Sequence, residues 1–484
     1  MQRSISVALI GIIGGLCLAL ASLQPGRGAV PPVGAANPNI GYPDFSYRTK
    51  GVTDPTGEKP QSKLWYHDGR WWGSLFHVAS GTYHIFWLNL ATQQWIDTGT
   101  VLDDRPATKA DCLWDSTANK LYVVSGGAGS TADARLFRYS YDTGSQTYTL
   151  DSGFPVTVRS GGAETIVIDK DTTGQLWITY TQGSRVYVNR STTADNLWGS
   201  PFLVPAPGVN ARVASDDISS LVAFDGKIAV VWSNQTDDTF YYAIHNDADP
   251  DTTWSGGVAL RDPSIADDHI NLKSLQADSA GNVFAVVKTS IGGTTSDTPQ
   301  ILLLARRPDG SWDSAMVSSG AENQTRPILL IDTDYRQIYV FSSNESGGIV
   351  YYKRSAIDNL QFPAGFGTPF ISSSTYTSIN NATSTKQNLN RATGIVVLAS
   401  DDSKKFYLHN YLDLSGAGVT VTPVTPTRTP SPTPTATATP SPSATPSATA
   451  TPTPSATPTP AATPGRTPQN FKSYIPLVAG APGV

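Results

Sequence analysis

The residues of this chain that are best suited to chemistry are ionisable groups that stand just before a repeated strand pattern. Asp267-Asp268-His269 is the densest of these groups. Histidine titrates near neutral pH, and a neighbouring carboxylate would hold its tautomer and raise its pKa. The triplet therefore predicts a general acid or base at this point of the chain.

Ionisable residues recur at the corresponding point of the other repeats. The carboxylates are Asp111, Glu164, Asp217 and Asp268, and the cations are Lys109, Lys273, Arg326 and Lys386. If the fold gathers these positions, the carboxylates would shift one another's pKa values and the cations would clamp an acidic ligand. We therefore assign catalytic roles to the carboxylates and His269, and substrate binding to the four cations. A structural alternative is that such Asp side chains bond backbone amides of neighbouring loops.

The elements that would position these groups form a repeat between Trp65 and Leu414. Each copy has an Asp-rich turn, then a run of β-branched and aromatic residues, then a second aromatic-rich segment. The first runs begin, 52 to 57 residues apart, at Leu121, Leu176, Ile228, Val283, Ile338 and Ile395. Such a period, with strand-like alternation and few helical patterns, is typical of propeller blades. We predict an all-β fold, a seven-bladed β-propeller, with six blades as the alternative because the first and last copies are degenerate.

The ring of such a propeller has to be closed. The seventh copy has no fourth strand, and an open ring would expose a strand edge. We predict that a strand within residues 42–59 completes the last blade. The N-terminal segment would then span residues 22–62 and the propeller residues 63–414.

Residues 1–21 have the layout of a secretory signal peptide. Arg3 precedes an apolar core at Val7–Leu20, and Ala19 and Ala21 provide small residues. We expect cleavage after Ala21, with a cut near Ala29 as the alternative, and hence a protein that is secreted or displayed on the cell surface. The apolar stretch is short for a bilayer span, so no membrane insertion is expected after cleavage. Only Cys112 would remain, which excludes an intrachain disulfide from the mature chain.

Residues 421–469 consist almost entirely of Thr, Pro, Ser and Ala. Such a segment cannot bury apolar surface, so we predict a disordered linker. Residues 470–484 contain Tyr474-Ile475-Pro476-Leu477-Val478, which is similar to the short tails behind Thr/Pro-rich linkers in certain exported bacterial proteins. The resemblance implies a sorting signal that attaches the protein to the cell envelope, and a frayed terminus is the alternative.

Charge limits the class of partner. The formal charge of the chain is −5, and no cluster of Lys and Arg stands out. A basic surface for nucleic acid or for anionic membranes is therefore excluded. We expect a monomer whose partner is a polysaccharide or another glycan.

The segment DDHINLKSLQADSAGNVFAVV from Asp267 resembles the start of blades in BNR-repeat, sialidase-like propellers. This group includes polysaccharide lyases typified by the ulvan lyases. The resemblance implies that His269 acts as base or acid and that Lys or Arg side chains neutralise a uronate carboxylate. The sialidase turn is matched less well, because DADPDTTW from Asp247 and STTADNLW from Ser191 lack its Gly. Of the three arginines that sialidases use, only Arg326 is suitably placed.

Metal chemistry has weaker signals. The paired acids Asp216-Asp217 and Asp267-Asp268 could bind Ca²⁺ through oxygen ligands. Otherwise we predict no cofactor and no metal site. The remaining histidines are interpreted as strand or turn residues: His67, His77, His84, His245 and His409.

Two function classes stay open. The first is an exported polysaccharide lyase or glycoside hydrolase that acts at the mouth of the propeller channel. The second is a non-catalytic module that binds glycan or protein through the same mouth and through exposed aromatics such as Trp71 and Trp72. Two carboxylates about 5–10 Å apart would favour a glycosidase, and a His–Tyr pair beside cations would favour a lyase.

Overall fold

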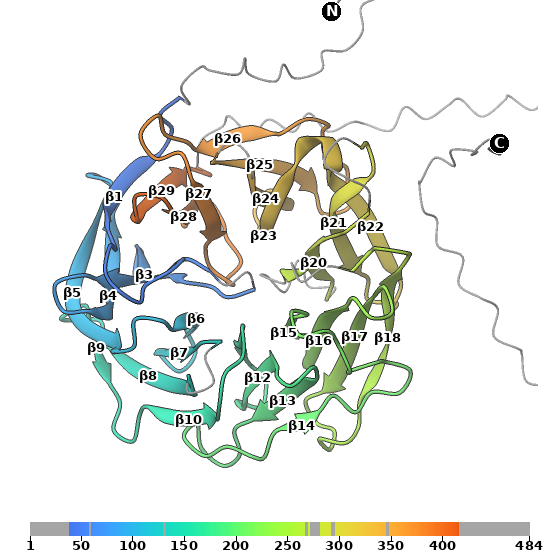
Figure 1. The fold of residues 1–484 in the computed structure, drawn as a ribbon. Helices are drawn as coiled ribbons and strands as arrows, with labels where there is room; N and C mark the ends of the chain where they lie inside the picture. The colour runs from blue at the N-terminus through green and yellow to red at the C-terminus, as the bar shows by residue number, and fades with distance from the viewer. Residues whose placement is uncertain are drawn as a thin grey trace, which may run out of the picture. The chain divides into compact units, whose positions relative to one another are not determined.

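The computed structural model describes residues 38–415, except 58–59, 129–131, 267–269, 272–280, 292–295 and 345–347. In this part of the chain the strands form seven antiparallel sheets arranged as a ring around a central axis (Figure 1). The predicted seven-bladed β-propeller is therefore confirmed. The helical content of the described residues is one short 3₁₀ turn, η1 (Gly320–Glu322). None of the helices described is long and apolar enough to span a membrane.

Blades 1 to 6 are each built from strands that follow one another along the chain, and blade 7 combines three such strands with β1. The first strand of each blade lies nearest the axis (Figure 1). Blade 1 consists of β2 (Leu64–His67), β3 (Arg70–His77), β4 (Thr82–Asn89) and β5 (Gln94–Asp103). Blade 2 consists of β6 (Lys109–Asp115), β7 (Lys120–Gly126), β8 (Ala134–Asp142) and β10 (Val156–Arg159), with β9 (Thr147–Leu150) also paired to β8. Blade 3 consists of β11 (Val167–Lys170), β12 (Leu176–Thr181), β13 (Val186–Arg190) and β14 (Phe202–Leu203). Blade 4 consists of β15 (Ser219–Phe224), β16 (Lys227–Asn234), β17 (Thr239–Asn246) and β18 (Ser255–Arg261). Blade 5 consists of β19 (Ile270–Asn271), β20 (Val283–Lys288), β21 (Pro299–Arg306) and β22 (Trp312–Ser319). Blade 6 consists of β23 (Gln324–Asp332), β24 (Gln337–Asn344), β25 (Ile349–Ala356) and β26 (Thr368–Ile371). Blade 7 consists of β27 (Ile379–Thr383), β28 (Ile395–Asp401), β29 (Phe406–Leu412) and β1 (Tyr42–Ser46).

The second strand of each blade explains why the repeat is visible in the sequence. In β16 every residue after Lys227 is buried, because neighbouring blades cover both faces of the sheet. A strand buried on both faces requires a continuous run of apolar, β-branched and aromatic residues rather than an alternating one. The runs predicted from Leu121 to Ile395 accordingly coincide, within one residue, with the starts of the second strands of blades 2 to 7.

Trp71 and Trp72 illustrate the same rule. Both lie in β3, the second strand of blade 1, and both are fully buried. Trp71 Nε1 donates a hydrogen bond of 2.8 Å to the carbonyl oxygen of Thr393. The expectation that these two side chains form an exposed sugar platform is therefore wrong, because blade packing covers both faces of the strand.

The last blade is closed by the N-terminal strand. β1 pairs antiparallel with β29, with Tyr42 opposite His409, and it lies inside the range 42–59 for which a closing strand is predicted. His409 Nδ1 is 2.6 Å from Asp44 Oδ1, and both side chains are buried. Burial raises the pKa of Asp44 to about 6, against the effect of His409. Gln93 Oε1 of blade 1 lies 3.0 Å from His409 Nε2, so this histidine links blades 7 and 1.

The two ends of the axis are built differently. Each first strand begins after a connection from the previous blade, and the end that carries these connections is termed the start face. Each first strand ends in a turn that leads to the second strand, and the end that carries these turns is termed the turn face. In blade 2, for example, Lys109 marks the start face and Asp115 the turn face.

Candidate functional site

The connection between β1 and β2, residues 47–63, runs inward from the rim of the start face (Figure 1). Three hydrogen bonds attach it to three blades: Thr56 Oγ1 to Ser400 Oγ of blade 7 (2.9 Å), Ser62 N to Asp111 Oδ1 of blade 2 (2.7 Å), and Gln61 Nε2 to the carbonyl oxygen of Ile166, just before blade 3 (3.0 Å). A connection of this length in a compact fold is usually functional rather than a mere link.

Two carboxyl groups meet on the start face. Asp54 belongs to the connection 47–63, and Asp402 begins the turn between β28 and β29. The two side chains are hydrogen-bonded to each other and only partly buried. Two carboxylates in direct contact cannot both ionise easily, so the pair holds one proton between them.

The pKa values of the pair are separated. Burial, the hydrogen bond with Asp54 and the charge of Asp54 raise the pKa of Asp402 to about 7. Burial also disfavours ionisation of Asp54, but the hydrogen bond from Asp402 and the nearby cations outweigh it and lower the pKa of Asp54. Near pH 7 the pair thus offers one ionised carboxylate and one carboxyl group that is about half protonated, the arrangement needed for a base and an acid in one site.

Three cations surround this carboxylate pair. Lys109, Lys405 and Arg326 each lower the pKa of Asp54 through their charge. Lys109 Nζ also donates to the backbone carbonyl oxygens of Thr53 and Asp54. Arg326 has a left-handed backbone with φ of 50° at a bulge in β23, and bulges commonly redirect a side chain next to a site. The start face therefore combines a proton-sharing pair with a positively charged surround that suits an acidic ligand.

Lys109 and Arg326 are the two sequence-predicted residues that lie with this pair. Asp111 and Lys386 instead form a buried ion pair of 2.7 Å nearer the axis. Asp111 also accepts from Ser62 N (2.7 Å) and Ile168 N (2.9 Å), and Lys386 Nζ donates to the carbonyl oxygen of Ile168. Both side chains are thus committed to holding blades 2, 3 and 7 together.

The placement of Lys386 at the start of a first strand is wrong. The first strand of blade 7 is β27 (Ile379–Thr383), so Lys386 follows it. β27 reads INNAT, which has no apolar run. Such a short polar strand gives no signal in the sequence, and the repeat was therefore assigned a few residues too late.

The other predicted carboxylates have local roles or lie apart from the pair. Asp217 is buried, with Oδ2 accepting from Ala214 N (2.7 Å) and Gln235 N (3.1 Å), and burial raises its pKa. This matches the structural alternative of an Asp that satisfies backbone amides. Glu164 is half-buried in the connection that leads into β11. Asp268, His269 and Lys273 lie outside the described residues.

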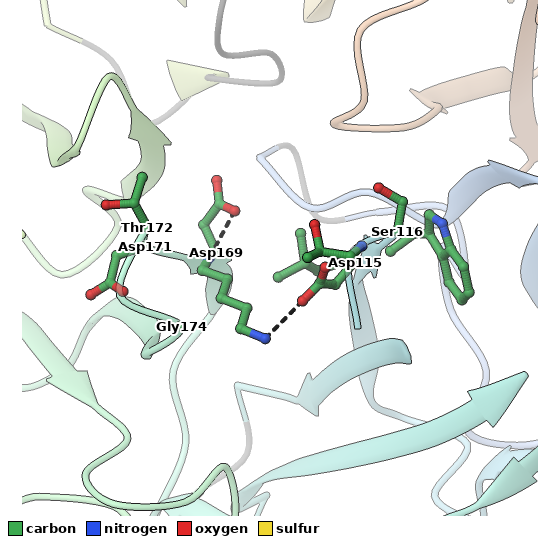
Figure 2. Close-up of a pocket in the computed structure, with 10 residues that line it drawn as sticks. Asp115, Ser116, Asp169, Asp171, Thr172 and Gly174 are labelled. Atoms are coloured by element: carbon green, nitrogen blue, oxygen red, sulfur yellow. Dashed lines mark hydrogen bonds and ion pairs between the residues drawn. The ribbon is translucent and has the colours of Figure 1, made fainter. Parts of the chain in front are cut away.

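The turn face carries a hollow of about 600 Å³ between blades 2 and 3 (Figure 2). Its lining residues are Leu113, Trp114, Asp115, Ser116, Thr117, Asp169, Lys170, Asp171, Thr172 and Gly174. A second hollow of about 230 Å³ shares Leu113, Asp169 and Lys170 and extends to Lys386 and Ala223. The larger volume is within the range of small-molecule sites in proteins.

The charged groups of this hollow are paired with one another or with the backbone. Lys170 Nζ lies 2.7 Å from Asp115 Oδ2 (Figure 2), and Asp115 Oδ1 accepts from Thr117 N (2.9 Å). Asp171 accepts from Thr173 N (2.9 Å) and from Trp177 Nε1 (2.7 Å). The hollow therefore presents polar walls, and its carboxylates are engaged in building the turns. The ring of Trp114 is buried against His67 and Tyr141.

The charge of Asp169 is also held in place. Its Oδ2 accepts from Ala223 N and its Oδ1 from Lys170 N, at 2.9 and 2.8 Å. Burial raises its pKa, while Lys386 and the two amides act in the opposite direction. Both carboxylate oxygens are thus occupied, and the group joins blade 3 to blade 4.

No family model matches the chain, and no curated protein does either. Among solved structures, a protein from Lactobacillus plantarum matches with a TM-score of 0.45 and 12% identity, over 71% of this chain and 92% of that one. Polysaccharide lyase Uly1 matches with a TM-score of 0.43 and 9% identity over 77% and 92%. A GH43_1 enzyme from Xanthomonas citri, complexed with xylotriose, matches with a TM-score of 0.33 and 13% identity over 57% and 93%. Such distant likeness says nothing of the activity of this chain, which has to be argued from its own side chains.

Proposed function

We propose that the protein is a carbohydrate-active propeller that transfers protons on an acidic polysaccharide at its start face. The observation that carries this proposal is the carboxylate pair Asp54–Asp402 beside Lys109, Arg326 and Lys405. A pair that titrates near neutral pH is suited to acid and base catalysis. The surrounding cations favour a substrate that carries carboxylates, such as a uronate-containing chain.

The contact between the two carboxyl groups favours elimination over hydrolysis. Glycosidases keep their two carboxyl groups about 5–10 Å apart to accommodate the sugar and water, whereas Asp54 and Asp402 are directly hydrogen-bonded. In an elimination, the ionised carboxylate removes the proton from the carbon next to the uronate carboxyl group. The neutral carboxyl group then protonates the leaving glycosidic oxygen, and a carbon–carbon double bond forms as that bond breaks. The cations stabilise the charge that develops on the uronate.

His269, Asp268 and Lys273 are retained as proposed participants in the same reaction. Asp268 and His269 directly precede β19, the first strand of blade 5, and Lys273 follows it after one further residue. The segment that contains them resembles the blade start of polysaccharide-lyase propellers, in which a histidine takes part in proton transfer.

We further propose that the reaction takes place outside the cell. Polysaccharides of this kind are extracellular, and residues 1–21 have the layout of an export signal. The Thr/Pro-rich segment 421–469 would then serve as a spacer between the propeller and the cell envelope.

The test is a screen of the full chain against acidic and neutral polysaccharides, with absorbance of the unsaturated uronate and new reducing ends as readouts. Asp402→Asn keeps the size of the side chain but abolishes the shared proton, so the rate should fall by about 10²–10⁴-fold. Asp238→Asn is the matched control, because Asp238 lies in the corresponding turn of blade 4, and its rate should stay within about twofold of the unmodified chain. Equal loss in both variants, or none in Asp402→Asn, would refute the assignment of the pair.

The second candidate function is non-catalytic glycan binding at the turn face. The hollow of about 600 Å³ with several hydroxyl groups favours it, since a concave site with a few polar groups can hydrogen-bond a sugar. Retention on immobilised glycans without any product, weakened by Lys170→Met but not by Asp402→Asn, would identify the protein as a binding module.

A further inference from the structure

Blade 1 brings two histidines and one aspartate together near its outer edge. One nitrogen of His77, one of His84 and a carboxylate oxygen of Asp97 all lie within 4.8 Å of one another. His84 Nδ1 is 3.0 Å from each oxygen of Asp97, and His77 Nε2 is 3.9 Å from Asp97 Oδ2. The side chains of His77 and Asp97 are 37% and 28% exposed, so an ion in solvent can reach the cluster.

The strands explain how residues that are far apart in sequence meet here. His77 ends β3, and His84 lies near the start of β4, so one hairpin carries both rings, stacked with their centroids 4.7 Å apart. Asp97 is in β5, where the register against β4 shifts between His84 and Phe86. The shift belongs to a bulge that contains Gly99, with φ of 75°, and it turns Asp97 toward His84.

The ring nitrogens that face away from Asp97 are held by hydroxyl groups. Ser80 Oγ lies 2.9 Å from His77 Nδ1 and 3.0 Å from His84 Nε2. Thr82 Oγ1 lies 2.9 Å from His84 Nε2. Such contacts fix the orientation of the two rings, which is how the surroundings of a metal site support its ligands.

We propose that His77, His84 and Asp97 bind a divalent transition-metal ion, of which Zn²⁺ is the best fit. Two imidazoles and one carboxylate are common zinc ligands, and a set of three leaves the fourth tetrahedral position to water or to another ligand. Ligand atoms around a tetrahedral Zn²⁺ stand about 3.3 Å apart. His84 and Asp97 already satisfy this spacing, and the exposed ring of His77 closes the remaining gap. Ca²⁺ is a poor fit, because it takes six to eight oxygen ligands.

Zinc binding would replace the proton that lies between His84 and Asp97 in the metal-free chain. In the metal-free chain, the hydrogen bond between His84 Nδ1 and Asp97 places a proton where the metal would sit. Only a deprotonated nitrogen binds a metal, so on Zn²⁺ binding the proton moves to His84 Nε2, which then donates to the hydroxyl groups of Ser80 and Thr82.

The experiment is a calorimetric titration of the chelator-treated full chain with ZnCl₂, and separately with CaCl₂ and MgCl₂. A saturable zinc site that weakens at least tenfold in His77→Ala and in Asp97→Asn is the expected result, with far weaker binding of Ca²⁺ and Mg²⁺. His67→Gln is the control, because His67 lies outside the cluster, and it should leave the affinity unchanged.

His77→Ala decides the outcome by itself, since His77 is exposed and its loss should not unfold the chain. A zinc affinity that is unchanged in this variant would overturn the proposal, as would the absence of zinc binding. A visible spectrum with Co²⁺ that has the intense bands of a tetrahedral site, and loses them in His77→Ala, would support it by an independent measurement.

Discussion

The start face and the turn face are made by the same seven blades, yet the carboxylates of their two candidate sites have different partners. On the turn face, Asp115 and Asp171 use their oxygens to bond turn amides, Lys170 or the indole of Trp177. On the start face, Asp54 and Asp402 bond each other and share a proton among three cations.

The difference follows from how each face is built. In blades 1 to 4 and 6 the turns between first and second strands are short, and Asp is used there because its side chain closes the turn onto the backbone. The start face contains the long connection 47–63, which is found in the one place where the ring closes. The repeated turns thus stabilise the blades, whereas the unrepeated connection 47–63 supplies Asp54 to the carboxylate pair.

The largest effect should come from breaking the ion pair between the two faces. Lys386→Met leaves Asp111 charged and buried without its cation, which should lower the free energy of unfolding by about 3–5 kcal/mol. Urea unfolding measures this loss. The double variant Lys386→Met with Asp111→Leu removes both charges and should recover most of the stability, and a loss below ~1 kcal/mol in the single variant would show that the pair does not hold the axis.

A smaller effect should appear in the pH dependence of stability. The pKa of Asp402 is raised from 3.8 to about 7 in the folded chain, so between these values the folded state holds a proton that the unfolded state lacks. Its contribution is present at pH 4 and is lost as the pH rises through 7. Because the group is partly exposed and screened, we expect the loss to be roughly 1–2 kcal/mol. Asp402→Asn should abolish this decline, as measured by unfolding at pH 5 and pH 8, and an equal decline in Asp238→Asn and Asp402→Asn would contradict the assignment.

Removing one cation should sharpen the contrast between the faces. Arg326 lowers the pKa of Asp402 by its charge, so Arg326→Met should raise the pH midpoint of this carboxyl group by up to about one unit. Carbon-13 NMR of the Asp carboxyl groups would follow the titration directly. Lys170→Met on the turn face is the comparison, and a shift of equal size in both variants would mean that the change is not local.

The smallest effect is expected on the turn face itself. The Lys170–Asp115 pair is near the surface, with side chains that are 19% and 13% exposed, and such pairs contribute up to about 1 kcal/mol. Lys170→Met should therefore lower the free energy of unfolding by roughly 0.5–1 kcal/mol and leave its pH dependence unchanged. A loss of stability as large as that of Lys386→Met would contradict the view that the buried Lys386–Asp111 pair contributes more than the partly exposed Lys170–Asp115 pair.

The sequence predicts the fold well and the site only in part. Second strands are buried on both faces, so their continuous apolar runs reveal the blades. Lys109 and Arg326 are also found in advance, because they stand at the starts of first strands. Asp54 and Asp402 were missed because Asp54 lies in the unrepeated connection 47–63 and Asp402 in a turn between second and third strands, not at the start of a first strand. Only ring closure brings residues so distant in sequence together.

The cluster proposed as a metal site has no clear signal in the sequence, for a related reason. His77 and His84 read as ordinary strand residues, and the sequence offers no sign of the bulge that turns Asp97 toward them. Positions that depend on a register shift cannot be assigned from an alternating pattern, because one inserted residue reverses which side chains face each other.

Ring closure by β1 also bears on how a cell makes this protein. Asp44 in β1 and His409 in β29 are 365 residues apart, so β1 is translated long before the strand with which it pairs. Blades 1 to 6 can form as they emerge from the ribosome, but β1 keeps a free edge until β29 exists. We expect closure to be the final and slow step of folding, and an interruption of synthesis shortly before residue 412 would leave a nearly complete chain that is prone to pair with another copy of itself.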